Sequence, residues 1–329
     1  MRVDELPLTL GPHPRGPHNA ITDVPGVRVG HATLASGDLR TGVTAIVPDQ
    51  LGASRRQLPA GLFVGNGFGK LVGATQLREL GAIETPVLLT STLSAFRVAD
   101  ALVAHVLAWP GYADVTTLNP VVGETNDGYL SDVRARAVGA EQVEEALASA
   151  SGGPVGEGCI GAGAGTTALG FKGGVGTSSR RVDVAGESYA VGSLVQSNFS
   201  GTLTVAGVPV PAEEPVGETD GNSCMIVVAT DAPLDARQLD RAARRAVFAM
   251  GRVGASFAHG SGDYALAFSV GSGTPPADAA LDPLFGAAMD AVEEALLNSV
   301  LMATTTRGFR GHVARAVPAD AVRARLDLT

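Results

Sequence analysis

Short apolar runs alternate with amphipathic stretches along the first half of the chain. Apolar runs rich in β-branched residues and bounded by glycine or proline are typical of strands. Apolar positions three or four residues apart are typical of helices, and the helix expected at 93–109 ends before Pro110. Strand patterns lie around 28–34 and at 43–47 and 86–91, and helical patterns lie at 71–80, 93–109 and 133–150.

The second half begins with a glycine-rich segment, 151–179, which predicts a long ordered loop, and such loops often carry function. Asp235 and Gln238 have the spacing of a capping box for a helix that continues through Met250. A longer helix follows Asp282 and Pro283. Strands are expected at 189–198, 202–210, 223–230 and 264–270. This alternation favours one α/β domain over residues 1–329.

Composition excludes several classes of protein. With 329 residues, of which 45% are hydrophobic and 17% charged, the chain has ample material for a large core and is not disordered. The 24 basic and 33 acidic residues give a net charge of −9 without a basic cluster, so nucleic acid is not expected as a partner. No apolar run reaches the roughly 18 residues that a membrane span needs. The first twenty residues do not resemble a secretion signal, so we expect a cytoplasmic protein without membrane contact.

The familiar cofactor and metal motifs are absent or incomplete. Cys159 and Cys224 lack zinc-site spacing, and the six histidines show no paired metal pattern, so neither a metal nor an organic cofactor is expected. The GxGxxG match at 156–161 does not follow a strand. The segment around Lys70 resembles a phosphate-binding loop only loosely, and a glycine turn before a helix explains it better. Only Lys70 and Lys172 are lysines, against 22 arginines, which raises the question of why arginine does not serve there.

One local pattern indicates chemistry: the turn-forming sequence Thr219-Asp220-Gly221-Asn222-Ser223 directly before a buried strand. If the turn holds the Asn222 carbonyl against the Ser223 hydroxyl, an N-to-O acyl shift produces an ester. Hydrolysis of that ester leaves Ser223 as a new N-terminus, whose α-amine, with a pKa of about 7.7 to 8.0, is a general base for its own hydroxyl. An ordinary hairpin or strand start explains the same residues. A serine triad such as Ser223, His259 and Asp263 is a further reading, although no GxSxG elbow is present.

Seven segments of the chain together resemble the L-aminopeptidase/D-esterase family of self-processing hydrolases, which includes the β-peptidyl aminopeptidases and nylon-oligomer hydrolases. The resemblance covers nearly the whole chain, and several of the matching stretches are long and unusual. The segments are ITDVPGVRVGH (21–31), NPVVGETNDG (119–128), GFKGGVGTSSR (170–180), GSLVQSNFSG (192–201), GNSCMIVVATDAPL (221–234), HGSGDYALAFS (259–269) and ATTTRGFRGH (303–312).

The resemblance implies a role for each matching residue. Ser223 matches the nucleophile, so cleavage between Asn222 and Ser223 would give an α chain, 1–222, and a β chain, 223–329. Asn198 matches the oxyanion-hole asparagine. Ser261 and Asp263 match the pair that positions the new amine and hydroxyl. Lys172 matches a lysine that assists proton transfer, although a loop lysine that bonds to carbonyls explains it equally well. Glu124 matches the carboxylate that holds the substrate's ammonium group, and Tyr129 would line the pocket or assist at the oxyanion.

The resemblance also implies a fold and an activity. The expected fold is a four-layer α/β/β/α sandwich similar to the N-terminal-nucleophile hydrolases, and the expected assembly is a homo-oligomer of αβ units, a tetramer. The expected reaction releases N-terminal residues from small peptides, amino-acyl amides or esters. An acyltransferase of the ornithine acetyltransferase type and a non-catalytic binding protein with the same fold are the alternatives. Cys224 follows Ser223 on a strand, so its side chain should face away from Ser223 into the core.

Overall fold

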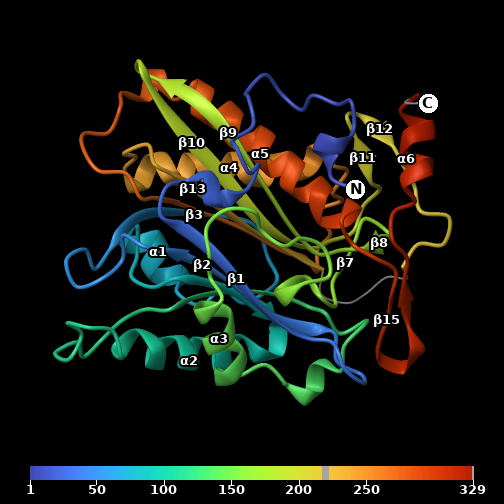
Figure 1. Ribbon diagram of the computed structural model, residues 1–329, viewed down its shortest axis with the longest axis horizontal. Coiled ribbons are helices and arrows are strands. Elements are labelled where there is room, and N and C mark those ends of the chain that lie inside the picture. The colour runs from blue at the N-terminus through green and yellow to red at the C-terminus, as the bar shows by residue number, and fades with distance from the viewer. Residues whose placement is uncertain (217–221, 328–329) are drawn as a thin grey trace.

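Two β-sheets lie face to face, and helices cover the outer side of each (Figure 1). The computed structural model describes residues 1–216 and 222–327. In Figure 1 the layers run from α4 and α5 through the two sheets to α2 and α3, which confirms the expected four-layer α/β/β/α sandwich. The helices are α1 (Ala74–Leu80), α2 (Ala95–Leu107), α3 (Ala140–Ala148), α4 (Ala236–Arg252), α5 (Asp282–Leu301) and α6 (Ala319–Arg325).

The larger sheet has six strands in the order β4-β3-β14-β13-β10-β9. Its centre is the parallel pair β13 and β14, and the other neighbours are antiparallel. The fully buried run 223–230 is thus an inner strand of the sheet, as its uninterrupted apolar pattern predicts. The strands are β3 (Leu58–Gly67), β4 (Ala82–Ile83), β9 (Val175–Val184), β10 (Glu187–Asn198), β13 (Ser223–Thr230) and β14 (Gly262–Ser269).

The smaller sheet has four strands in the order β1-β2-β5-β6, with β5 and β6 parallel. It consists of β1 (Val27–Leu34), β2 (Thr41–Pro48), β5 (Val87–Ser91) and β6 (Val121–Thr125). Three two-stranded ribbons complete the described strands: β7 (Thr167–Ala168) with β8 (Phe171–Lys172), β11 (Thr204–Val205) with β12 (Val208–Pro209), and β15 (Thr306–Arg307) with β16 (Val313–Ala314).

Alternating side chains of β13 enter two different cores. Cys224, Ile226 and Val228 pack with residues of α4 and α5, whereas Met225 and Val227 pack with residues of the smaller sheet. Successive side chains on a strand point to opposite faces. The expectation that Cys224 faces the core on the side away from Ser223 is therefore confirmed, and Ser223 belongs to the face between the two sheets.

Glycines allow helices to approach the larger sheet closely. A Cβ atom on Gly176 of β9 would lie 2.0 Å from the carbonyl oxygen of Ala295 in α5. A Cβ atom on Gly61 of β3 would lie 2.1 Å from the backbone nitrogen of Asp240 in α4. Contacts of this kind explain part of the glycine excess, since any larger residue would force the layers apart.

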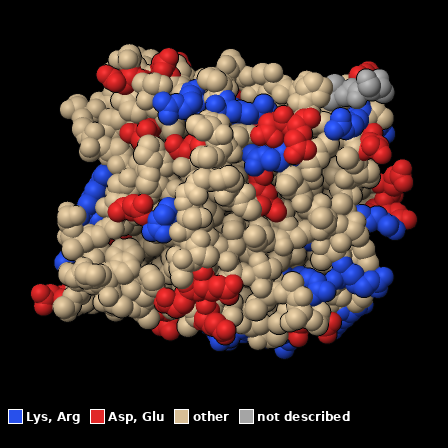
Figure 2. All heavy atoms as spheres, in the orientation of Figure 1, with Lys and Arg blue, Asp and Glu red and all other residues tan. Residues whose placement is uncertain are grey.

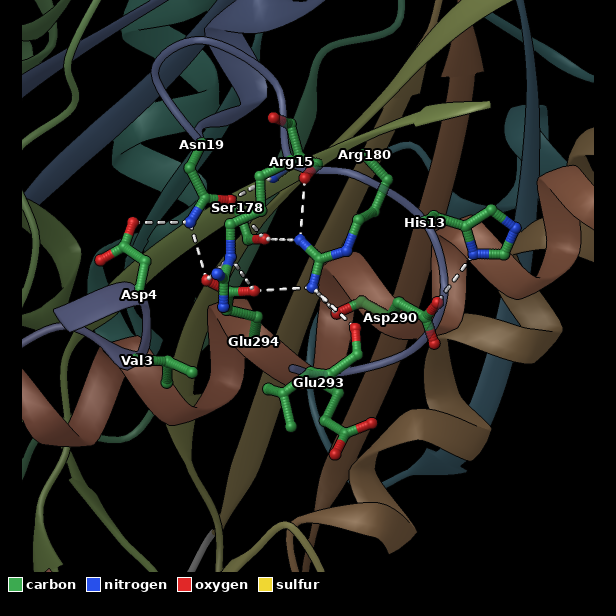
Figure 3. A network of polar contacts seen from close by, with 12 residues as sticks. Val3, Asp4, His13, Arg15, Asn19, Ser178, Arg180, Asp290, Glu293 and Glu294 are labelled. Carbon is green, nitrogen blue, oxygen red and sulfur yellow. Dashed lines mark hydrogen bonds and ion pairs between the residues drawn. The ribbon is translucent and has the colours of Figure 1, made fainter. Parts of the chain in front are cut away.

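A buried polar network fixes the N-terminal arm, residues 1–26, to β9 and α5 (Figure 3). Arg180 of β9 is 1% exposed and lies 2.6 Å from the carboxylate of Glu294 in α5, which is fully buried. Arg15 of the arm binds the same carboxylate at 2.9 Å, and His13 lies 2.8 Å from Asp290. The arm is therefore part of the folded domain, because its side chains pair with buried carboxylates that would be costly to leave without a partner.

Charged side chains of both signs are interspersed over the face that Figure 2 shows, in small clusters rather than in one stripe. The acidic excess of the chain is therefore not gathered into a single patch on this face. In the described part of the chain, no helix combines the length and apolarity needed to cross a bilayer.

Several elements differ from the sequence predictions. The helix expected at 133–150 is confined to Ala140–Ala148, because Arg136 has a left-handed backbone (φ +47°) and Gly139 is extended. The loop expected at 151–179 ends earlier, where β9 begins, and the strand expected at 202–210 is only a short ribbon. β3 and β6 were not predicted, the latter because buried polar residues interrupt its apolar pattern. The capping box is confirmed, since Gln238 N–H donates to Asp235 Oδ1 at 2.7 Å.

Candidate active site

Ser223 is the first residue of β13 and lies between the ends of two neighbouring strands. It pairs with Asn198 at the end of β10 and with Gly262 at the start of β14. Its side chain is buried, and its Oγ has no hydrogen-bond partner among the described residues. The carbonyl oxygen of Asn222, on the bond that precedes Ser223, accepts a hydrogen bond from Gly262 N–H at 2.9 Å. The residues Thr219–Gly221 of the predicted turn lie outside the described residues.

Asn198 presents a hydrogen-bond donor on the same face of the sheet as Ser223. Residues directly opposite each other on antiparallel strands have Cβ atoms about 4.5–5.5 Å apart. The Oδ1 atom of Asn198 accepts from Thr167 N–H at 3.0 Å, which fixes the orientation of the amide. Its Nδ2 is buried and has no partner within the described chain. This amide can therefore donate to an oxygen that carries negative charge beside Ser223.

Ser261 and Asp263 form a pair at the start of β14, as the two-residue spacing predicts. The hydroxyl of Ser261 donates to Asp263 Oδ1 at 2.7 Å. The other carboxyl oxygen of Asp263 is buried and unpartnered among the described residues. Burial raises the pKa of Asp263 above its ordinary value, and the bond from Ser261 opposes that shift. The pair lies next to Gly262, the parallel neighbour of Ser223.

A cavity of about 340 Å³ connects Ser223 with Glu124, although the two residues belong to different sheets. Glu124 is 3% exposed and lies on the edge strand β6. Its Oε1 accepts from Lys70 N–H at 2.8 Å and lies 3.3 Å from Lys70 Nζ. The described lining residues are Gly67, Phe68, Gly69, Lys70, Thr92, Glu124, Asn126, Asn222 and Ser223.

Lys172 lies outside this lining, in a buried glycine-rich loop. Its Nζ donates to the carbonyl oxygens of Gly163 at 2.9 Å and Gly173 at 2.8 Å. Burial lowers its pKa to about 8, against the opposing charge of Cys159 and Asp127. Its strand β8 pairs with β7, where Thr167 holds Asn198. The structure therefore places Lys172 where it supports the loop behind Asn198, and direct proton transfer by Lys172 stays a prediction.

Tyr129 also lies outside the described lining of the cavity. Its ring stacks on His312, with ring centroids 4.5 Å apart and planes 13° apart. His312 Nδ1 is 2.8 Å from the carbonyl oxygen of Tyr129. These contacts tie residue 129 to the C-terminal segment, and its proposed part at the substrate stays a prediction.

The cysteines and acidic residues do not suggest a metal centre. Among the described residues, no group of three or more His, Cys, Asp or Glu side chains could hold a metal ion. Burial, followed by the nearby Asp263 charge, raises the pKa of Cys224 well above its ordinary value. A protonated thiol in the core is a poor nucleophile.

Sequence reasoning did not assign Lys70, Phe68, Thr92 or Asn126 to the site. The available signals are the motif GNGFGKL, which predicts a turn before a helix, and the presence of Lys70 in a chain with only two lysines. Their proximity to Ser223 depends on how the two sheets pack, because β3 belongs to the larger sheet and β6 to the smaller one. A sequence pattern does not specify that packing.

Comparisons with known proteins agree with this geometry. The sequence profile of peptidase family S58 matches residues 19–314. The β-peptidyl aminopeptidase BapA of Sphingosinicella microcystinivorans is 39% identical, over 94% of this chain and 88% of that protein. A solved structure from Pyrococcus horikoshii has 42% identity, a TM-score of 0.93 and 99% coverage of both chains.

The L-aminopeptidase/D-Ala-esterase/amidase of Ochrobactrum anthropi has a TM-score of 0.89 and 35% identity, over 98% of this chain and 96% of that one. Its structure is described as a prototype for the serine aminopeptidases and a new variant of the Ntn-hydrolase fold. The layered architecture seen here is the same fold. This chain therefore belongs to peptidase family S58 and is a hydrolase of the Ntn-fold aminopeptidase type.

Proposed function

We propose that this chain is a self-processing serine aminopeptidase in which Ser223 is the nucleophile. One observation carries the assignment of the site. Ser223 Oγ and Asn198 Nδ2, on residues directly opposite each other in adjacent strands, are buried polar atoms without a hydrogen-bond partner among the described residues, and so is Asp263 Oδ2 at the start of the next strand, in register with Cys224. Buried polar atoms are normally paired, so a cluster of unpaired ones indicates a functional site. Ser223 also shares a cavity with a buried carboxylate, that of Glu124.

The self-processing step cleaves the bond between Asn222 and Ser223. The Ser223 hydroxyl attacks the Asn222 carbonyl, the C–N bond breaks, and the hydroxyl proton passes to the departing nitrogen. Gly262 N–H, which already donates to this carbonyl oxygen, stabilises the charge that develops on it. Water then hydrolyses the resulting ester. The products are a carboxylate on Asn222 and a free amine on Ser223, in chains 1–222 and 223–329.

The processed site then acts on the N-terminal residue of a small substrate. The Ser223 α-amine accepts the hydroxyl proton as Oγ attacks the substrate carbonyl, and it passes that proton to the leaving amine as the scissile C–N bond breaks. Water then hydrolyses the acyl ester on Ser223 and releases the N-terminal residue. Asn198 Nδ2 and a backbone N–H stabilise the oxyanion, and the Ser261–Asp263 pair positions the amine. Glu124 binds the substrate's ammonium group, which restricts cleavage to chain ends. Lys172 and Tyr129 complete the assignment as residues that support the loops around this centre.

The substrates we propose are short peptides, amino-acyl amides and esters, including those that begin with a β-amino acid. The names of the relatives support this choice, since one is a β-peptidyl aminopeptidase and another an aminopeptidase with esterase and amidase activity. The same names support hydrolysis over acyl transfer or simple binding. The cavity volume of about 340 Å³ suits a small molecule.

The decisive experiment is an intact-mass spectrum of freshly purified protein beside a Ser223→Ala variant expressed in the same way. The proposal expects two fragments, 1–222 and 223–329, in the wild type and one full-length species in the variant. A full-length wild type after prolonged incubation would rule out self-processing. If cleavage occurs, release of alanine from alaninamide without any added acyl acceptor separates hydrolysis from acyl transfer.

We further propose that the αβ units assemble into a cytoplasmic homo-oligomer, a tetramer. The family resemblance supports the assembly. Light scattering of the processed protein tests the first statement, and fractionation of the source cells tests the second. A monomeric mass or an exported protein would refute the respective statement.

A further inference from the structure

Lys70 and Glu124 are the only charged residues in the described lining of the cavity that contains Ser223. The backbone N–H and the ammonium group of Lys70 both contact one oxygen of Glu124, Oε1. A Cβ atom on the preceding Gly69 would lie 3.1 Å from that oxygen, so the absence of a side chain there permits the close approach. The cavity therefore has a fixed anion and a cation supplied by the chain itself.

The two partners of this ion pair differ in exposure. The side chain of Glu124 is 4% exposed and that of Lys70 is 35% exposed. Because the Lys70 side chain is partly exposed, its ammonium can move toward solvent when the ammonium of a ligand takes its place beside the buried Glu124 carboxylate. A ligand that carries only an ammonium group would compete with Lys70 for Glu124, so two cations would lie in a cavity with one carboxylate. A ligand with an ammonium and a carboxylate would instead form two opposite pairs, one with Glu124 and one with Lys70.

We propose that Lys70 determines substrate specificity by binding the free carboxylate of a zwitterionic substrate, so that the preferred substrates are dipeptides. This inference rests on the proposed function, because it takes Glu124 as the ammonium site. The termini of an extended dipeptide are about 7 Å apart, and each further residue adds about 3.5 Å. Longer peptides therefore carry their carboxylate beyond the reach of one lysine side chain.

The test compares two substrates that differ only in that carboxylate: β-alanyl-alanine and its C-terminal amide. We expect the wild type to hydrolyse the free acid with a kcat/KM about tenfold higher than the amide, mainly through a lower KM, as a charge-assisted contact of a partly exposed lysine would give. In a Lys70→Met variant the ratio should fall to about one or below. The ratio is independent of how much active enzyme each preparation contains.

Two variants control for charge and for position. Lys70→Arg keeps the positive charge and should keep a preference for the free acid. Arg78→Met removes a positive charge from an exposed residue of α1 outside this cavity and should leave the ratio unchanged. Isothermal titration of both compounds into the uncleaved Ser223→Ala protein measures the ratio of their binding affinities, since the cavity is present before the chain is cut.

The results separate this inference from the proposed function. Equal ratios in the wild type and Lys70→Met, by kinetics and by titration, would overturn the role of Lys70 and leave the aminopeptidase assignment intact. A wild type that prefers the amide would also overturn it. Loss of self-cleavage or activity in the wild type would instead count against the proposed function, and titration would still decide whether Lys70 recognises a carboxylate.

Discussion

Replacing Asn198 with alanine should cost both activity and stability, by different amounts and for different reasons. The alanine removes Nδ2, the donor opposite Ser223, and it also removes Oδ1, the acceptor of Thr167 N–H. Loss of one oxyanion-hole donor lowers kcat by about 10²–10³-fold in hydrolases. The unpaired Thr167 N–H is buried, which costs about 1–3 kcal/mol of unfolding free energy.

The neighbouring Ser197 provides a matched control, because its side chain lies on the opposite face of β10. Its hydroxyl is within 2.7 Å of Ser299 Oγ in α5 and accepts from Gly174 N–H at 3.2 Å. Ser197→Ala should therefore lose a similar unfolding free energy, about 1–3 kcal/mol, while kcat stays within about twofold of the wild type.

The assay measures kcat and KM on an amino-acyl amide and the urea-unfolding free energy for both variants. The extent of self-cleavage is measured first by mass, so that kcat refers to processed enzyme only. The reasoning would be refuted if Asn198→Ala kept more than a third of the wild-type kcat. It would also be refuted if Ser197→Ala lost as much kcat as Asn198→Ala, since a general weakening of β10 would then explain both.

Two further predictions concern the buried charges. Arg180→Met should lower the unfolding free energy by about 3–5 kcal/mol, because it leaves the buried Glu294 carboxylate with only Arg15 as a cationic partner. The exposed pair of Arg28 and Asp49 offers the comparison: Arg28→Met should cost less than about 1 kcal/mol in the same urea titration, and equal losses would contradict the argument. Because burial lowers the pKa of Lys172 to about 8 from 10.5, the unfolded chain binds more protons between these values, and stability should rise with pH across that window. A Lys172→Met variant should lose that rise, and an unchanged pH profile would show that Lys172 is not the cause.

The sequence predicted the parts of the fold that depend on local periodicity. The strand at 223–230 has a continuous apolar run, the strand at 189–198 has two short apolar runs, and the helix after Asp235 has a capping box; the structure confirms all three. β6 was missed for a physical reason. Its Glu124 and Thr125 are buried polar residues whose cost is offset by partners elsewhere in the chain, such as Lys70 in the loop after β3 and Gln196 on β10. A pattern that counts apolar residues cannot detect such a strand.

The residues of the candidate site likewise differ in whether the sequence could identify them. Residues at strand ends could be named from their motif positions: Asn198 lies in register with Ser223, and Asp263 directly follows Gly262, the parallel partner of Ser223. Lys70 could not, because it lies in the loop after β3 and its partner Glu124 lies on β6 of the smaller sheet. The role of Lys172 also needed the structure, since only the coordinates show its ammonium bound to Gly163 and Gly173 rather than facing the cavity.

One arrangement of strands explains how the same residue serves both processing and turnover. Before cleavage, the carbonyl of Asn222 lies directly before β13 and accepts a hydrogen bond from Gly262 N–H. The first peptide bond that Ser223 attacks is therefore already held beside the nucleophile. In the proposed mechanism, cleavage frees the Ser223 amine next to Gly262, which lies between Ser261 and Asp263, while β10 and β14 continue to hold Asn198 and Gly262 in register. The donors that face Ser223 belong to strands that the cut does not touch. A site that is preorganised in this way needs no rearrangement of the sheet to pass from its first substrate, its own chain, to a second one in the cavity beside Glu124.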